Sequence, residues 1–98
     1  MGPYQSHHIT WEGIAIEIRW NPTHYRGDDC EIAHLELRTE PCQRLPMTET
    51  GYRSHFVHRE QVESHGGPVL YVEAWLAHDA LSREWKRYVE ESKQISLF

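Results

Sequence analysis

Apolar and polar side chains alternate over two neighbouring segments near the N-terminus, 9–11 and 14–20. A period of two is typical of a half-buried β-strand. The apolar positions are odd-numbered in the first segment and even-numbered in the second, and Glu12-Gly13 lies between them. A two-residue turn with glycine at its second central position accounts for this change, so the pattern predicts a hairpin. One long strand with a glycine bulge is the alternative.

The middle of the chain predicts two more strands. Residues 21–29 are rich in turn-forming side chains and are predicted to form a loop. Residues 31–38 alternate, with apolar side chains on one face and His34 among the polar side chains on the other, as in a half-buried antiparallel strand. Segment 39–46 contains two prolines and reads as a connection, and 51–57 is a further strand candidate. We expect these strands to pair in chain order, as a meander.

The apolar period changes after Gly66-Gly67-Pro68. Proline is favoured at the first position of a helix, and apolar residues then recur at steps of three and four, so a helix over 68–78 is predicted. The same run also alternates, which leaves a strand as the alternative.

A second helix is predicted after this one, because Asp79 or Ser82 can cap it. The apolar side chains of this helix fall on one stripe. They are Leu81, Trp85, Tyr88 and Val89. The helical pattern ends at Ser92-Lys93.

Strands followed by helices predict an α+β domain, a small antiparallel sheet of three or four strands with two helices packed on one face. Ninety-eight residues suffice for one small core. We therefore expect a single domain over residues 1–93 and a short tail over 94–98. The four tryptophans fall on the predicted apolar faces and are expected in the core.

Charge and composition narrow the function classes. The formal net charge is −5, and the basic residues are scattered among acidic ones, so direct nucleic-acid binding is not expected. No apolar stretch is long enough to span a membrane. The N-terminus has neither a basic start nor an apolar run, which argues against a signal peptide and for a cytoplasmic protein with its two cysteines reduced.

The histidines and cysteines predict no metal centre and no catalytic residue. A zinc site needs three or four converging ligands, whereas His55 and His58 are three apart and point to opposite faces of a strand. Cys42 would need a neighbouring histidine and a third orienting group to act as a nucleophile. An enzyme that uses His55, His58 and Cys42 is therefore the third-ranked hypothesis, and no cofactor is expected.

Hydrogen-bonding side chains crowd around the single glycine of segment 48–55. Binding residues often lie on loops that a rigid scaffold holds, so this segment is a candidate recognition loop. Its members are Thr48, Glu49, Thr50, Tyr52, Arg53 and His55. The segment lacks the several glycines and the lysine of a phosphate-binding loop. A polar turn that leads into a strand is the alternative.

The last five residues are Gln94, Ile95, Ser96, Leu97 and Phe98. This ending resembles the pentapeptide with which bacterial proteins dock on the replication sliding clamp. The resemblance implies an extended peptide in which Leu97 and Phe98 fill an apolar pocket and the Gln94 amide bonds at a second site. Ile95 would make a partial contact, and Ser96 would be a spacer.

The resemblance implies a non-enzymatic accessory or adaptor protein of bacterial DNA replication or repair, docked on the sliding clamp through its tail. The alternative is a small cytoplasmic interaction or regulatory domain whose tail packs on its own core. The body of the chain is similar to uncharacterised small bacterial proteins that share a Trp-x-Gly-Ile-x-Ile-x-Ile start and a Thr-Glu-Thr-Gly-Tyr-Arg-Ser-His-Phe segment, and this similarity implies no function.

Overall fold

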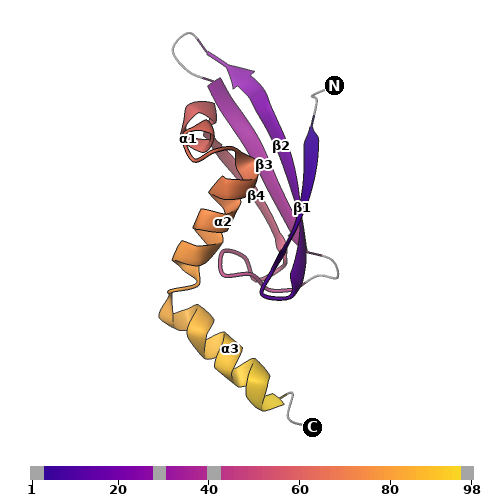
Figure 1. The fold of residues 1–98 in the computed structure, drawn as a ribbon, viewed down its shortest axis with the longest axis vertical. Coiled ribbons are helices and arrows are strands. Elements are labelled where there is room, and N and C mark those ends of the chain that lie inside the picture. The colour runs from indigo at the N-terminus through magenta and orange to yellow at the C-terminus, as the bar shows by residue number, and fades with distance from the viewer. Residues whose placement is uncertain (1–3, 28–30, 40–42, 96–98) are drawn as a thin grey trace.

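The computed structural model describes residues 4–27, 31–39 and 43–95, with side chains described as far as Ser92. Four strands come first and three helices follow (Figure 1). The elements are β1 (Gln5–Trp11), β2 (Ile14–Arg26), β3 (Glu31–Thr39), β4 (Tyr52–His58), α1 (Arg59–Glu63), α2 (Pro68–Asp79) and α3 (Arg83–Ile95). The strands form one antiparallel sheet in the order β1-β2-β3-β4. The predicted α+β fold with a meander sheet is confirmed.

The turn between β1 and β2 is the predicted two-residue hairpin. Trp11 pairs with Ile14, and the two residues between them have positive φ, 51° at Glu12 and 79° at Gly13. Positive φ at both central residues is the signature of the turn type that matches the twist of two paired strands. Local chemistry is therefore enough to set the register of this hairpin.

The loop predicted over residues 21–29 is wrong for its first part, because β2 continues to Arg26. The pairing register with β3 shifts between Asn21 and Tyr25, which marks a bulge. Pro22 lies inside this irregularity, where a residue without an N–H group is tolerated, and Asn21 Oδ1 accepts a 3.2 Å hydrogen bond from the Thr23 amide. Residues 28 and 29 lie outside the described residues.

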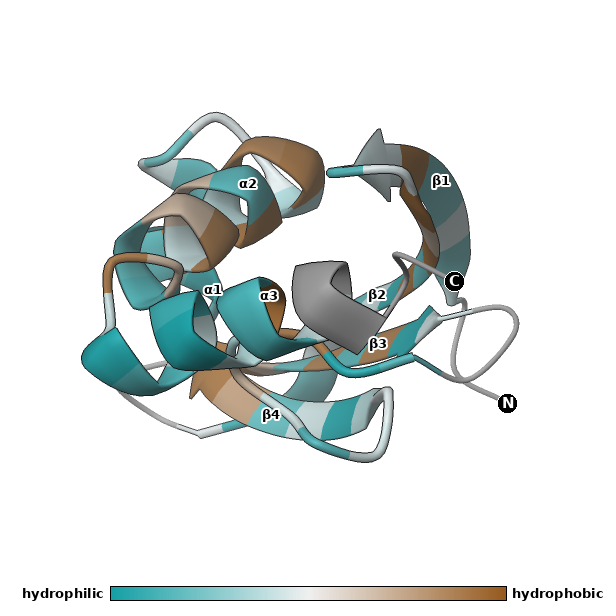
Figure 2. Ribbon diagram, turned by 90° about the horizontal axis from the view of Figure 1, so that it is seen from below, coloured by the Kyte–Doolittle hydropathy of each residue, from teal (hydrophilic) through white to brown (hydrophobic). Residues whose placement is uncertain are grey.

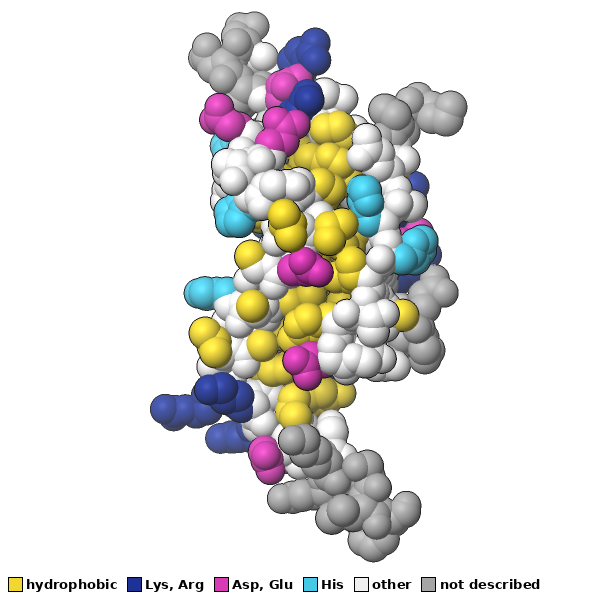
Figure 3. Space-filling view, in the orientation of Figure 1, with side chains coloured by type: hydrophobic (Ala, Val, Ile, Leu, Met, Phe, Trp, Pro, Cys, Tyr) yellow, Lys and Arg dark blue, Asp and Glu magenta, His cyan; other side chains and the backbone are white. Residues whose placement is uncertain are grey.

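The core lies between one face of the sheet and the helices α1 and α2. Its fully buried side chains come from β2, β3, both helices and the connection before β4. Figure 2 shows the helices on one side of the sheet, and on that side hydrophobic side chains gather along the middle of the surface (Figure 3). The core residues include Ile16, Ile18, Ala33, Leu35, Leu37, Leu45, Val62, Val72 and Leu76.

The tryptophans occupy the predicted apolar positions. Trp20 and Trp85 are 4% and 8% exposed, and Trp11 and Trp75 pack as partly buried side chains against the core. These residues therefore contribute aromatic burial to a core whose fully buried side chains are mainly aliphatic.

The helix predicted over 68–78 is confirmed as α2, which excludes the strand alternative. The short helix α1 was not predicted. It has five residues and one buried side chain, Val62, and five residues are too few for a helical period to appear in the sequence. An ion pair of 2.7 Å between Arg59 and Glu63 spans its single turn.

The second predicted helix is α3, and Ser82 is its cap, since Ser82 Oγ accepts a 3.1 Å hydrogen bond from the Trp85 amide. Asp79 belongs to α2 instead. Leu81 was wrongly placed on the apolar stripe: it lies in the turn between α2 and α3 and is 69% exposed. The helix continues to Ile95, two residues beyond the predicted end.

Helix α3 extends past the end of the sheet and lengthens the molecule, which measures 55 × 25 × 19 Å (Figure 1). Its first two turns contact the domain. The Trp85 and Trp11 rings lie 5.7 Å apart, and the Arg44 guanidinium lies 4.8 Å from the centre of the Tyr88 ring. Within the described ranges, no helix combines the length and the apolar character needed to cross a membrane.

Candidate functional site

Among the described residues, every helix lies off one face of the sheet, the face opposite α1 and α2 (Figure 2). We call it the open face. The pairing register arranges its side chains in rows that run across the strands. One row contains Ser6, Arg19, Glu36 and Ser54, the next contains His8, Glu17, Arg38 and Tyr52, and a row on the other side contains Asn21, His34 and Phe56. The open face thus brings together polar and aromatic groups from all four strands.

Hydrogen bonds hold the centre of the open face in one arrangement. Arg19 Nη1 lies 3.4 Å from Glu36 Oε1, and the Tyr52 hydroxyl donates to Glu36 Oε2 at 3.0 Å. This hydrogen bond is the main reason that the pKa of Tyr52 is raised. The Arg19 guanidinium also lies 4.6 Å from the centre of the Tyr4 ring. Three strands and the segment before β1 are therefore linked through side chains.

His34 is the buried member of the open face, with 7% of its surface exposed. Its Nδ1 atom lies 2.6 Å from the Tyr4 hydroxyl, and its Nε2 atom lies 2.6 Å from Ser54 Oγ. The Phe56 ring stacks on the imidazole at 4.6 Å, and the His24 ring lies 5.3 Å away. The aromatic cover explains why a histidine on the predicted polar side of β3 is buried.

The pair of Ser54 and His34 resembles part of a nucleophilic triad, in which a histidine removes the serine proton. The third group here is the Tyr4 hydroxyl. A phenol donates readily to a ring nitrogen, which leaves the proton of a neutral imidazole on Nε2, directed at Ser54. In that tautomer the His34 Nε2–H group donates to Ser54 Oγ and holds the Ser54 hydroxyl in place.

The buried His34 gives the first testable prediction. Burial lowers the pKa of His34 from its ordinary value of 6.5 and outweighs the nearby Glu36 carboxylate, which raises it. Below pH 6.5 His34 therefore binds a proton more readily in the unfolded chain than in the folded one. Protonation of His34 thus lowers the free energy of unfolding as the pH falls, until the pH passes the pKa of His34 in the folded state. His34→Gln should flatten this dependence in urea unfolding between about pH 7.5 and pH 5.5.

The matched control is His78→Gln, since the His78 side chain is 85% exposed. This variant is expected to keep the pH dependence of the wild-type protein. If the stability of His34→Gln varied with pH as that of the wild-type protein does, the loss of stability at acidic pH could not be assigned to His34.

The candidate recognition loop is divided by the structure. The Thr48 hydroxyl donates to the Tyr52 carbonyl at 2.8 Å and lies 3.2 Å from the Thr50 hydroxyl, so these polar groups close a turn. Glu49 in this turn is exposed. Tyr52 points to the open face, where it bonds Glu36.

Arg53 and His55 lie on the other side of β4, against α2. The His55 and Trp75 rings are 4.7 Å apart, and the Arg53 guanidinium lies 5.7 Å from the Trp75 ring. Burial, followed by the charge of Arg53, lowers the pKa of His55. The six predicted residues therefore do not converge on one site.

The histidines singled out for a metal do not converge either. His55 is directed at the α2 aromatic rings, whereas His58 is exposed at the end of β4. In the part of the chain that the structure describes, no three His, Cys, Asp or Glu side chains lie close enough to hold a metal ion. Cys30 and Cys42 lie outside the described residues.

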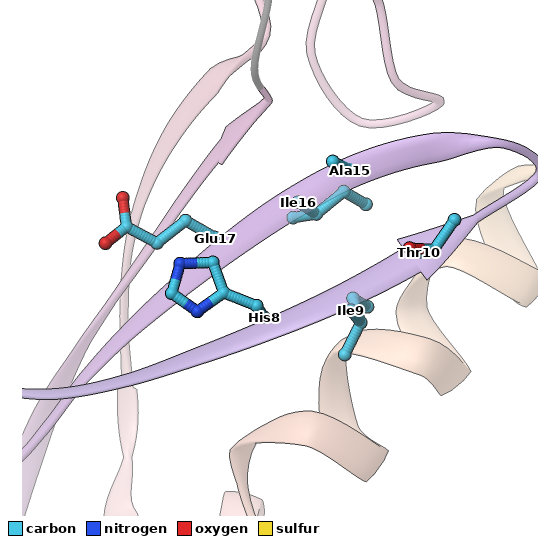
Figure 4. Close-up of a pocket in the computed structure, with 6 residues that line it drawn as sticks. All are labelled: His8, Ile9, Thr10, Ala15, Ile16 and Glu17. Carbon is cyan, nitrogen blue, oxygen red and sulfur yellow. The ribbon is translucent and has the colours of Figure 1, made fainter.

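Two hollows border the candidate surfaces. One, of about 330 Å³, lies over the β1–β2 hairpin, where His8 and Glu17 project at one end and Thr10 lies near the other (Figure 4). A larger one, of about 490 Å³, lies between α3 and the hairpin turn. Its lining residues are Glu12, Ile14, Gln43, Arg44, Trp85, Tyr88, Val89 and Ser92.

The predicted clamp-binding residues are only partly described. Gln94 and Ile95 form the end of α3, and Ser96, Leu97 and Phe98 lie outside the described residues. Sequence reasoning did not group Tyr4, His34 and Phe56 as one site. The alternation of residues 52–57 places Tyr52, Ser54 and Phe56 on one side of the predicted strand, and this was the sequence signal for a shared face. The register that brings His34 next to Ser54 follows only from the assembled sheet.

Comparison with known proteins identifies the domain. The family model described as the KlcB third domain matches residues 4–85, which includes the whole sheet, α1, α2 and the start of α3. No curated protein and no solved structure matches the chain. Since the matched region covers well over half of the sequence, the chain belongs to the KlcB third domain family.

Proposed function

We propose that this protein is a non-enzymatic adaptor of bacterial DNA replication or repair. In this proposal residues 94–98 dock on the sliding clamp in the cytoplasm, and the α+β domain engages a second protein. The observation that carries the proposal is the ending Gln94-Ile95-Ser96-Leu97-Phe98, which fits the clamp-binding pentapeptide at every position. The family match ends at residue 85, so the motif lies on a part of the chain separate from the matched domain.

The expected affinity follows from burial and ordering. Burying the Leu97 and Phe98 side chains contributes about 2–3 kcal/mol each. Fixing a flexible peptide offsets much of this, so we expect a dissociation constant in the micromolar range. Gln94 and Ile95 would have to leave the last turn of α3 to bind in an extended form. That turn ends the helix and is the part that frays most readily.

A protein is a better second partner than DNA for the domain. On the open face Arg19 is neutralised by Glu36 at 3.4 Å, and Glu17 lies opposite Arg38 in the strand register. Phosphate binding needs a face with an excess of positive charge. The mixed charges and the net charge of −5 favour a polar protein surface.

The test is a titration of the bacterial sliding clamp with the intact protein and with Leu97→Ala/Phe98→Ala. We expect micromolar binding by the intact chain and a loss of at least about tenfold in the variant, because both apolar anchors are removed. A matched control is Leu70→Ala/Leu81→Ala, since these side chains are 52% and 69% exposed on the domain. This control should bind like the intact protein, and failure of the intact protein to bind would exclude the proposal.

Thermal unfolding separates this proposal from the alternative in which the tail completes the domain's own core. Deletion of residues 94–98 should leave the melting temperature unchanged if the tail serves a partner. A drop of about 4–8 °C, which corresponds to roughly 1 kcal/mol in a domain of this size, would favour the alternative.

A further inference from the structure

Four charged side chains form a square at the centre of the open face. Glu17 and Arg19 lie on β2, and Glu36 and Arg38 lie on β3. The register pairs Glu17 with Arg38 and Arg19 with Glu36. The sign of the charge therefore alternates along each strand and also across the strand pair. We call these four residues the charge square.

The charge square is complementary to itself. When a second copy is placed face to face about a two-fold axis along the strands, Glu17 meets the partner's Arg38 and Arg19 meets the partner's Glu36. An axis across the strands brings Glu17 to the partner's Arg19 instead, which is again an opposite charge. A surface with like charges along one strand or across one row would meet its own sign about one of these axes. Symmetric dimers require such a self-complementary patch.

Two of the four residues of the charge square, Glu17 and Arg38, are free to pair with charges on a partner. Arg19 and Glu36 bond each other at 3.4 Å, and Glu36 also accepts from Tyr52 at 3.0 Å. Glu17 and Arg38 are opposite in the register, yet among the ion pairs of the described chain none joins them. Arg38 is exposed. A second copy would provide each of these two groups with an opposite charge.

Exposed aromatic side chains lie beside the charge square on β4 and farther along β2. Tyr25, Tyr52 and Phe56 are 61%, 43% and 58% exposed, and register places all three on the open face. Aromatic residues are enriched in protein interfaces. An axis along the strands between β2 and β3 exchanges the outer strands, so Phe56 would lie near the partner's Tyr4 and Tyr52 near the partner's His8. Two sheets packed in this way keep their strands roughly aligned, as sheet-on-sheet packing requires.

We infer that the open face binds a second copy of this chain and forms a symmetric face-to-face dimer centred on the charge square. The partner is identified by charge complementarity together with the exposed aromatic rim. This dimer goes beyond the proposed function, because neither the clamp nor residues 94–98 take part in it. Its test also needs no clamp, so the two proposals fail independently.

The decisive experiment uses two variants of opposite charge. Arg19→Glu/Arg38→Glu makes the charge square entirely negative, and Glu17→Lys/Glu36→Lys makes it entirely positive. Sedimentation velocity should show a dimer of the wild-type protein at about 100 µM, with each variant weakened at least about tenfold because like charges then face each other. An equimolar mixture of the two variants should restore dimers, because each negative square then faces a positive one.

A control pair, Arg83→Glu/Arg87→Glu, makes the same change in net charge at exposed positions on α3 and should dimerise like the wild-type protein. Circular dichroism checks that each variant is folded. If a double variant does not fold, Phe56→Arg tests the rim of the same face from a side chain that is 58% exposed and should weaken the dimer similarly. A wild-type protein that is monomeric up to about 1 mM, or folded variants whose mixture stays monomeric, would overturn the inference.

Discussion

Replacing Leu76 by alanine is expected to lower the free energy of unfolding by about 2–5 kcal/mol, which is a large share of the stability of a small domain. Leu76 is 0% exposed and lies on the side of α2 that faces the sheet. Removal of its branched end loses the transfer free energy of the buried atoms and leaves a cavity, because the surrounding strands relax only partly. Urea unfolding at neutral pH measures the loss directly.

Leu81→Ala is the matched control, since it removes the same atoms from a side chain that is 69% exposed. Its effect should stay within about 0.5 kcal/mol. Equal losses in the two variants would contradict the placement of Leu76 in the core. Since Leu81 was predicted to belong to the apolar stripe of the second helix, the same comparison also tests that correction.

Gly51→Ala is expected to cost about 2–4 kcal/mol, through backbone strain and the loss of buried hydrogen bonds. Gly51 has φ +84°, and an added Cβ would collide with Thr39 Oγ1 and lie 2.8 Å from the Gln43 carbonyl oxygen. Thr39 is 2% exposed, and its hydroxyl donates to the Gln43 carbonyl at 3.0 Å and accepts from the Gln43 amide at 2.7 Å. The methyl group would therefore disrupt the hydrogen bonds between Thr39 and Gln43, which tie the end of β3 to the connection that precedes β4.

Gly13→Ala separates strain from collision. Gly13 has φ +79°, close to that of Gly51, but a Cβ there meets no atom within 4 Å. Its cost should be only the roughly 1–2 kcal/mol of a left-handed conformation. The difference between the two variants in urea unfolding measures the packing around Thr39, and equal values would contradict a collision at Gly51.

Features that depend on neighbouring residues were predictable from the sequence. The change of parity across Glu12-Gly13 is sufficient to specify the hairpin, and Ser82 was one of the two caps that the sequence offered for the second helix, the other being Asp79. The same local reasoning failed at Asn21–Arg26, where turn-forming residues indicated a loop. There Tyr25 and Arg26 pair with Ile32 and Glu31 of the next strand, and this pairing outweighs the local preference.

The candidate site was less predictable, because it depends on register between strands. Alternation placed His34 on the polar side of β3 but gave no reason for its burial. The burial comes from Phe56 on β4 and Tyr4 before β1, which lie 22 and 30 positions away in the chain. The pairing register decides which side chains of neighbouring strands lie opposite one another, and it depends on the connection between the strands. The sequence of residues 40–46 contains no pattern that predicts the register between β3 and β4.

Helix α3 connects the domain to the proposed docking motif and would set how the domain is oriented when the motif is bound. The part of α3 that precedes Gln94 would stay helical on docking, and it corresponds to a rod of about 16 Å in which successive residues are rotated about the helix axis by about 100°. A flexible linker of the same length would let the domain face in any direction once its end was anchored. A rigid helix fixes the direction in which the open face points relative to the anchored tail. Insertion of a single residue into α3 would therefore change the distance between the domain and the anchored tail very little, but it would rotate the open face about the helix axis.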